Sequence, residues 1–379
     1  MKISIDRKKI TEALTTLAKA AARGNAMPIL TCVLLRAEGD AVRLTASDLD
    51  IEVTLALPAA VAETGGCALP AAQLRAIVSR MTGERIDIAD DGQRARVAGG
   101  RAKAHLPVLP LGDFPLIPAV NLPAGLDLPA SRLAAMLEAC SIATSTDGTR
   151  WYLAGVFLHH DAEDGCLHGA ATDGHRLVWV RTGEATATAW SGIIVPASAV
   201  SVMVPACRAH DADQAEVRAS DSKIRLSLPG LTITSKLVDG TFPDYRRVVP
   251  PAFTRSARIG RAALLDAVGR VNALANEDTN SKGRAIHMTH HATSLALRRT
   301  AAEASSSITD EVDAVVSDQA VDADPFVVGV NGVYLAAALG SLDCETVDLA
   351  TNDAMAPLRL TPVGEHGLAP IHIIMPMRG

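Results

Sequence analysis

Apolar residues along this 379-residue chain follow two alternating spacings, which succeed each other in a fixed order. At three places, a segment with an apolar residue at every second position leads into one with apolar residues three and four positions apart. Spacings of three and four are typical of a helix with one buried face. We therefore expect amphipathic helices over residues 10–22, 133–143 and 264–275, each preceded by a short strand.

A second helix signal follows each of these helices, after a strand and a Pro or Asn turn. The turn residues are Pro70, Pro196 and Asn331, so successive copies are about 126 and 135 residues apart. Strand-like segments lie between the two helices of each copy and again after the second one. Pro205, inside the second helix of the middle copy, predicts a kink or a short helix there.

Four landmarks appear three times in the same order: a strand leading into a helix, a series of strands, a second helix and a further series of strands. This repetition predicts three similar domains. Each domain is expected to be an α+β unit with two helices and about eight antiparallel strands. We place the domains at residues 1–122, 123–251 and 252–379, with boundaries in Pro-rich segments that lack a continuous pattern. The alternative is that any α+β chain shows such echoes.

Composition narrows the class of protein. Hydrophobic residues make up 48% and charged residues 21%, which is typical of folded domains, while aromatic residues are only 3%. We therefore expect cores built from Ala, Val, Ile and Leu. The six scattered cysteines include no Cys-x-x-Cys pair, and the first residues include no apolar leader segment. The longest apolar stretch, residues 193–206, is shorter than the roughly 20 residues that span a bilayer. We expect a cytoplasmic protein with reduced thiols and no membrane partner.

Signals for catalysis are weak. The chain contains no phosphate-binding loop, no dinucleotide-binding glycine motif and no nucleophile elbow. The adjacent pairs His159–His160 and His290–His291 lie on strand-like segments, where neighbours point to opposite faces, so we expect no metal site and no cofactor. Asp173 and His175 could form an acid/base pair, although a polar turn is the commoner role of Asp-Gly.

Four segments that combine apolar residues with arginine stand out in the second and third domains. They are residues 150–153, 172–177, 242–248 and 375–378. A groove of aliphatic and Met side chains with an arginine rim suits a short linear peptide, because Met adapts to varied apolar partners. The alternative is that prolines and arginines here only mark loops.

The same segments resemble the bacterial replicative sliding clamp, the beta subunit of DNA polymerase III. The resemblance is carried by residues 171–177, 234–248 and 375–378, and by the earlier residues 27–30 and 47–50. Together with the length and the threefold repeat, it covers essentially the whole chain.

The resemblance implies a head-to-tail homodimer that closes into a ring of six domains, with helices lining the hole and sheets outside. Duplex DNA would thread the hole without being read in sequence. The DNA polymerase III catalytic subunit, the clamp loader and other proteins with a clamp-binding motif would dock in a pocket between domains two and three. No catalytic residue is implied.

The resemblance also assigns residues to three surfaces. The peptide pocket would be formed by Arg150, Tyr152, Leu153, Thr172, Gly174, His175, Arg176, Leu177, Pro243, Arg247, Val248, Asn331, Tyr334, Met375, Pro376, Met377 and Arg378. The DNA-facing residues would be Lys8, Lys9, Lys19, Arg23, Arg75, Arg80, Trp151 and Tyr152. The subunit joint would include Ala104, Leu106, Ala273 and Leu274.

Two positions depart from the family pattern. Ala72 stands where a basic residue is frequent, and Ala104 is smaller than the residue often found at the joint. These changes predict a weaker DNA contact and a looser or differently packed ring. They are also compatible with a specialised clamp paralogue, which stays open as an alternative. A second alternative is an enzyme on the same scaffold that uses Asp173 and His175, although it would need a substrate cleft and a second reactive group that the sequence does not clearly offer.

The net charge of −6, from 36 basic and 42 acidic residues, at first disfavours a nucleic-acid partner. The six predicted helices, however, carry a summed charge of +7, which leaves −13 for the rest of the chain. This segregation of charge predicts that the helices give the hole of the ring a basic lining, while the outer surface of the ring is acidic.

Overall fold

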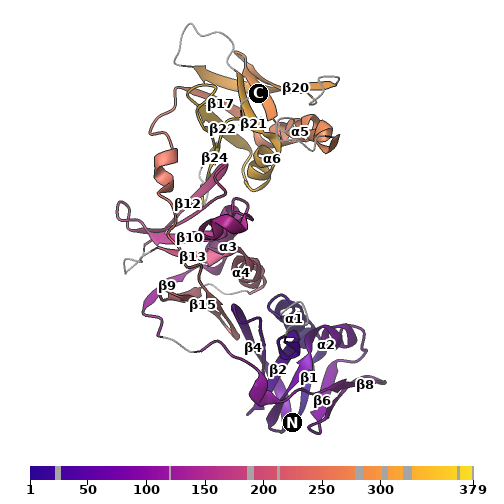
Figure 1. Cartoon of the computed structure of the whole chain (residues 1–379). Coiled ribbons are helices and arrows are strands. Elements are labelled where there is room, and N and C mark those ends of the chain that lie inside the picture. The colour runs from indigo at the N-terminus through magenta and orange to yellow at the C-terminus, as the bar shows by residue number, and fades with distance from the viewer. Residues whose placement is uncertain are drawn as a thin grey trace. The chain divides into compact units, whose positions relative to one another are not determined.

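The predicted order of elements recurs three times along the chain (Figure 1). Each time, one strand leads into a helix, four strands and a second helix follow, and three strands end the series. The helices are α1 (Arg7–Leu17), α2 (Ala71–Val78), α3 (Ala130–Ser141), α4 (Ala197–Ala209), α5 (Arg261–Val271) and α6 (Gly332–Gly340). The prediction of two helices and about eight antiparallel strands per repeat is confirmed.

The computed structural model describes residues 1–21, 27–118, 121–185, 192–210, 214–277, 285–300, 306–318, 327–364 and 368–377. Packing divides the chain into two units. The first consists of Met1–Ala134 and Ser198–Leu237, and the second of Ala135–Ala197 and Val238–Gly379. Strands of the middle repeat therefore contribute to both units.

The first unit contains one antiparallel sheet of twelve strands. Its main path runs β8-β7-β6-β1-β4-β16-β15-β14-β9, while β3 pairs with β4 and β2, and β2 pairs with β5. The strands are β1 (Lys2–Asp6), β2 (Cys32–Glu38), β3 (Ala41–Ser47), β4 (Ile51–Glu63), β5 (Gly65–Pro70), β6 (Arg85–Asp90), β7 (Arg94–Gly99), β8 (Ala102–Pro107), β9 (Ala124–Leu128), β14 (Ala215–Ala219), β15 (Lys223–Leu228) and β16 (Leu231–Lys236). Figure 1 shows α1 and α2 side by side against strands of this unit, with which they pack.

The second unit also contains a twelve-stranded antiparallel sheet, in the order β13-β10-β11-β12-β24-β23-β22-β17-β20-β19-β18-β21. The strands are β10 (Gly155–His160), β11 (Cys166–Thr172), β12 (Arg176–Ala185), β13 (Ile193–Pro196), β17 (Arg255–Gly260), β18 (Ala285–His290), β19 (Ser294–Thr300), β20 (Ser307–Asp318), β21 (Val327–Asn331), β22 (Thr346–Thr351), β23 (Leu358–Pro362) and β24 (Ile371–Ile374). Helices α5 and α6 pack against each other here. Three short 3₁₀ helices, η3 (Gly148–Leu153), η4 (Tyr245–Val248) and η5 (Asn272–Glu277), complete the elements used below.

Each unit contains a seam where two repeats share a sheet. In the first unit, the last strand of the middle repeat, β16, pairs with the long strand β4 of the first repeat, from Leu55↔Leu231 to Ile51↔Ser235. In the second unit, β24 pairs in the same way with β12. The last strand of one repeat thus extends the sheet of the repeat before it.

The ends of the helices follow from local chemistry. Helix α1 begins at Arg7, before the predicted residue 10, because the Asp6 carboxylate accepts a hydrogen bond from the backbone N–H of Lys9 at 2.9 Å. The same backbone bond holds the pKa of Asp6 below its usual value. The predicted end of this helix, residue 22, lies outside the described residues. Helix α4 runs for 13 residues with Pro205 inside it. Of the two outcomes expected for Pro205, a kink or a short helix, the short helix is therefore excluded.

The cores are mainly aliphatic, as the composition predicted, with one exception. Of the eleven aromatic residues of the chain, five gather in one cluster of the second unit: Trp179, Phe242 and Tyr245 are buried, and Tyr152 and Phe157 pack against them. This cluster lies beneath the pocket described below. In the described part of the chain, no helix is long and apolar enough to cross a membrane.

One buried histidine makes the stability of the second unit dependent on pH. His372 of β24 is only 2% exposed, and burial lowers its pKa to about 4. An unfolded histidine takes up its proton near pH 6.5, so below that pH the unfolded state binds more protons than the folded state. This contribution to stability is therefore present at pH 7 and is lost progressively as pH falls to about 4, up to roughly 3 kcal/mol.

We expect His372→Gln, which has no ionisable side chain, to lose less stability than the wild type between pH 7.5 and pH 4.5. The urea midpoint, followed by fluorescence of Trp179 on the neighbouring strand, measures this. His175→Gln, which changes an exposed histidine of the same unit, is the control. Equal shifts of the midpoint in all three proteins would contradict the assignment to His372.

Candidate functional site: a pocket at the β12–β24 seam

A cavity of about 260 Å³ lies within the second unit, on the seam between β12 and β24. Its walls come from η3, from the turn between β11 and β12, from η4 and the residues just before it, and from β24. The lining residues are Arg150, Tyr152, Leu153, Thr172, Gly174, Arg176, Leu177, Pro243, Asp244, Tyr245, Val248, Ile373 and Met375. Segments separated by more than two hundred residues of sequence therefore form one concave surface.

Ten of these residues were predicted from the sequence: Arg150, Tyr152, Leu153, Thr172, Gly174, Arg176, Leu177, Pro243, Val248 and Met375. The sequence reasoning missed Asp244, Tyr245 and Ile373. Two of them lie inside the motif of residues 234–248, and Ile373 stands two positions before Met375, on the same side of the chain in an extended segment. The motif could have identified Asp244 and Tyr245, and the alternation of side chains could have identified Ile373 from Met375.

The other predicted pocket residues do not line this cavity. His175 and Arg247 are exposed, and the Arg247 guanidinium pairs with Asp244 at 2.9 Å. Asn331 caps α6 by accepting hydrogen bonds from the backbone of Val333 and Tyr334.

Tyr334 lies behind the rim, where the Arg176 guanidinium sits 4.3 Å from its ring centre. Pro376 and Met377 follow the last lining residue of the chain, and the Met377 backbone N–H bonds to Gly329 at 2.8 Å. Arg378 lies outside the described residues.

The floor of the pocket is apolar. Leu153, Leu177, Tyr245 and Ile373 are each at most 5% exposed, and Leu177 is the strand partner of Ile373 across the seam. Met375, at 36% exposed, stands at the mouth. An apolar side chain entering here would leave water for a surface of Leu, Ile and aromatic atoms.

The rim is positive, and one turn fixes both of its arginines. The Asp173 carboxylate accepts hydrogen bonds from the backbone of His175 and Arg176, at 2.9 and 3.0 Å, and from the Arg176 guanidinium at 3.0 Å. Its backbone carbonyl accepts one from the Arg150 guanidinium at 2.8 Å. The Asp173 carboxylate therefore uses three hydrogen bonds to shape the turn and to hold Arg176.

Arg150 is held from the other side by Asp147, whose carboxylate accepts from the guanidinium at 2.9 Å. Hydrogen bonds from the side chain and backbone of Thr149, followed by that from Arg150, lower the pKa of Asp147 to about 2. The pair stays ionised at neutral pH, so the arginine head remains at the rim.

Three potential metal ligands, Asp161, Asp164 and His168, lie together in the described residues, with ligand atoms within 4.8 Å of one another. The carboxylates of Asp161 and Asp164 contact opposite ring nitrogens of His168, at 3.0 and 2.8 Å. Asp161 also forms an ion pair with Arg246. A cation would have to displace an arginine and could not meet all three ligands on one side, so the group does not suit a metal.

The predicted DNA-facing lysines and arginines are at the surface wherever the structure describes them. Lys8, Lys9 and Lys19 are exposed on or just after α1, whose opposite face is buried, and Arg75 and Arg80 are exposed on or just after α2. Arg23 lies outside the described residues.

Trp151 is 57% exposed, and its indole N–H bonds to the Asp239 carbonyl at 2.9 Å. Tyr152 turns its ring to the pocket instead and is half-buried.

The residues predicted for the subunit joint lie on two elements. Ala104 and Leu106 are on β8, which ends one path of the first sheet, and Leu106 is buried within its own unit. Ala273 and Leu274 are in η5 of the second unit, where Ala273 is exposed and Leu274 half-buried.

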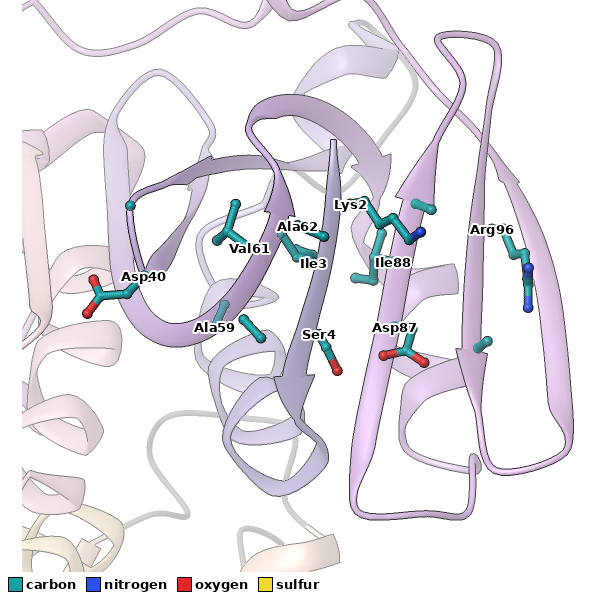
Figure 2. A pocket seen from close by; sticks show the side chains of 14 residues that line it. Lys2, Ile3, Ser4, Asp40, Ala59, Val61, Ala62, Asp87, Ile88 and Arg96 are labelled. Carbon is teal, nitrogen blue, oxygen red and sulfur yellow. The ribbon is translucent and has the colours of Figure 1, made fainter.

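A larger hollow, of about 600 Å³, lies over β1, β4, β6 and β7 of the first unit. Figure 2 shows most of its labelled side chains on these strands, with Asp40 in the turn between β2 and β3. Lys2, Asp87 and Arg96 are spaced among short side chains such as Ala59 and Ala62. None of the predicted site residues lines it. It is the outer face of a sheet built with small residues.

Three family models match the chain in succession. They are the N-terminal, central and C-terminal domains of the DNA polymerase III beta subunit, over residues 1–118, 127–244 and 246–378. The chain belongs to this family. Its three repeats are β-clamp domains, and its function is that of a sliding clamp, a non-catalytic processivity factor of DNA replication. The alternative of an enzyme that uses Asp173 and His175 was therefore wrong, in agreement with the engaged Asp173 carboxylate.

Relatives of this clamp match it from end to end. The beta sliding clamps of Caulobacter vibrioides and Escherichia coli K12 are 29% and 26% identical, each over 100% of both chains. The crystal structure of the Bartonella birtlesii sliding clamp bound to griselimycin has a TM-score of 0.91 and 32% identity, covering 100% of both chains. The crystal structure of the Pseudomonas aeruginosa beta subunit has a TM-score of 0.88 and 27% identity, and it also covers 100% of both chains. These matches favour a sliding clamp and give no support to a specialised paralogue.

The turn at the pocket rim requires glycine in this clamp. Gly174 has a φ of +86°, and a Cβ added there would lie 2.6 Å from the Arg150 guanidinium. We expect Gly174→Ala to lower the free energy of unfolding by about 1 kcal/mol, because the left-handed conformation disfavours a side chain. The midpoint of thermal unfolding measures it.

Gly148→Ala is the matched control. That glycine, at the start of η3, has no heavy atom within 4 Å of its added Cβ and no positive φ. A midpoint that falls equally for both variants would show that the turn is not the constraint.

Proposed function

We propose that the pocket at the β12–β24 seam receives short apolar peptide motifs of the DNA polymerase III catalytic subunit, the clamp loader and other DNA-processing proteins. The observation that carries the proposal is that ten residues assigned by motif from four distant segments line one cavity. The Bartonella clamp, 32% identical, is known bound to griselimycin, which supports a ligand-binding surface on this scaffold.

The chemistry of the pocket fits a motif with adjacent apolar side chains and an acidic group. Burial of one large apolar side chain contributes about 1.5–3 kcal/mol. The floor of Leu153, Leu177, Tyr245 and Ile373 provides that burial, while Arg150 and Arg176 offer guanidinium groups to a carboxylate. Such recognition tolerates variation, which suits a protein with several partners.

We infer that two copies close into a head-to-tail ring. In the repeats, β16 pairs with the long strand β4, and β24 with the long strand β12. Among the described strands, the corresponding long strand β20 has only β19 along Ser307–Asp313, and the corresponding last strand β8 has only β7. Pairing β8 of one copy with β20 of the other completes the same pattern at both ends of the chain.

Charge supports this pairing. The β8 edge carries Lys103, with Arg101 just before it, whereas this part of β20 carries Asp310, Glu311 and Asp313. Opposite charges at an antiparallel seam favour the contact and disfavour pairing of β8 with a second β8. The small Ala104 leaves the joint with less apolar contact than a bulky residue would, so charge carries a larger share.

We propose that duplex DNA passes through the ring against the helices, in contact with phosphates alone. The six helices carry a summed charge of +5 within the bounds given above, and the rest of the chain −11. Contacts to phosphate do not depend on sequence and allow movement along the duplex. Lys8, Lys9, Lys19, Arg75 and Arg80 are the candidates. We also propose a cytoplasmic location, because a protein that encircles replicating DNA acts in the compartment that holds this DNA.

The pocket is tested with griselimycin as the probe and isothermal titration calorimetry as the measurement. We expect Met375→Ala to weaken binding about fivefold, since roughly 1 kcal/mol of apolar contact is lost at a partly exposed residue. Removal of residues 375–379 is expected to weaken it further. Met355→Ala, at an exposed methionine of the same unit outside the pocket, should bind as the wild type does. Unchanged binding after the deletion would overturn the pocket assignment.

The ring is tested by mass and by topology. We expect a native mass of about 79 kDa, twice 39.5 kDa, by light scattering. After loading by its clamp loader, the protein should stay on nicked circular DNA and leave the same DNA quickly once one cut has made it linear, because only a closed ring is retained without strong contacts. Equal rates of departure, or a mass of one chain, would contradict the proposal.

A further inference from the structure

The wall of the pocket formed by η4 is fastened to the β10–β11 sheet through His159 and Asp161, two polar residues that do not line the cavity. Tyr245 and Arg246, neighbours in η4, each reach a different partner on or next to β10. The flanking Pro243, Asp244 and Val248 line the pocket, so the position of η4 decides the shape of that wall.

The first attachment is a hydrogen bond between Tyr245 and His159. The hydroxyl oxygen of Tyr245 lies 2.9 Å from Nε2 of His159, and Nδ1 of the same ring lies 3.0 Å from the backbone carbonyl of His160. A carbonyl only accepts, so Nδ1 carries the proton and Nε2 accepts from the tyrosine hydroxyl. Burial keeps both groups neutral, since it lowers the pKa of His159 and raises that of Tyr245.

The second attachment is an ion pair between Arg246 and Asp161. Asp161 is 3% exposed, accepts a hydrogen bond from the backbone of Glu163 at 2.8 Å, and contacts His168 at 3.0 Å. Arg246 also lies over the ring of Trp179, 5.9 Å from its centre. A buried carboxylate without its cation would be costly, so Asp161 holds the arginine strongly.

Aromatic stacking fills the space between these attachments. Phe157 of β10 stacks on Phe242, with ring centres 4.8 Å apart, and on His159 at 4.9 Å. Trp179 packs against Tyr245 at 5.7 Å. This is the aromatic cluster of an otherwise aliphatic chain, and it leaves η4 little freedom to move.

We propose that His159 and Asp161 are positioning residues for the peptide pocket, which set its η4 wall through Tyr245 and Arg246. Neither residue lines the cavity, and both lie outside every segment that the sequence pattern assigned to the pocket. The inference rests on the proposed function of the pocket. It adds that affinity for an apolar peptide ligand depends on a hydrogen bond and an ion pair behind the wall.

A double-mutant cycle tests the first attachment, with griselimycin as the probe and calorimetry as the measurement. His159→Leu keeps an apolar side chain in the aromatic stack but removes the acceptor, and Tyr245→Phe keeps the ring and removes the hydroxyl. Each is expected to weaken binding by about three- to tenfold, the range of one lost hydrogen bond. The double variant should bind no more weakly than either single one, because both remove the same bond.

Two further variants separate positioning from a general structural role. His159→Gln, whose side-chain carbonyl can accept from Tyr245, is expected to restore binding to within about twofold of the wild type. His160→Leu changes the next residue of β10, which faces the other side of the sheet, and should leave binding unchanged. Losses that simply add in the double variant, or variants that lower the thermal midpoint without weakening binding, would overturn the proposal.

The ion pair is tested by Asp161→Asn against Glu163→Gln, because Glu163 is exposed and lies 3.6 Å from the same arginine. We expect only the first to weaken binding. If Asp161→Asn does not fold, Arg246→Gln, which changes the other partner of the same ion pair, takes its place and is expected to weaken binding likewise. A wild type that does not bind griselimycin would refute the pocket itself, whereas a wild type that binds, with His159→Leu and Tyr245→Phe binding equally well, would refute only the positioning role.

Discussion

Pairing between the last strand of one repeat and the long strand of the repeat before it is the constraint on which the rest of this structure depends. It occurs at β4–β16 in the first unit and at β12–β24 in the second. A seam of this kind is made of backbone hydrogen bonds, so it requires no particular side chains and can recur in repeats of low identity. It also brings together the end of the chain and a strand about two hundred residues earlier, and the pocket exists only because Leu177 and Ile373 become strand partners there.

The scarcity of aromatic residues makes their distribution informative. Aliphatic side chains are sufficient for the cores of the β-clamp domains, where α5, α6 and their sheet pack with Leu, Val, Ile and Ala. Five of eleven aromatic residues nevertheless gather under the pocket. Rings have few rotatable bonds and defined stacking geometry, so a wall built on them is more rigid than one built on methionine or leucine. Rigidity under the wall and an adaptable methionine at the mouth are compatible, because one fixes the site and the other accommodates different ligands.

The sequence predicted the order of the elements and most of the pocket, because both depend on signals within short segments. Periodicity identified six helices, while their ends depended on caps such as Asp6 and on the change from α5 to η5, which periodicity does not report. Motifs identified the arginines of the rim and Leu153, Leu177 and Met375. Contacts behind the wall could not be predicted for a physical reason: Tyr245 meets His159 across 86 residues, and the adjacent pair His159–His160 gives no local signal for so distant a partner. The boundaries between the three domains stay predictions.

A clamp needs mobile contacts with DNA and lasting contacts with its protein partners. The chain uses different kinds of side chains for these two tasks. A closed ring is retained by topology, so the proposed contacts with DNA need only be positive, exposed and mobile. Under this proposal, an alanine at position 72 changes a sum of weak contributions and not a specific bond. The pocket has no such topological help, since a peptide leaves as fast as its contacts allow. Preorganised groups are therefore found where retention depends on them: arginines tied to Asp147 and Asp173 at the rim, and a wall tied to His159 and Asp161 behind it. For the proposed contacts with DNA, the exposed lysines and arginines on or just after α1 and α2 are sufficient.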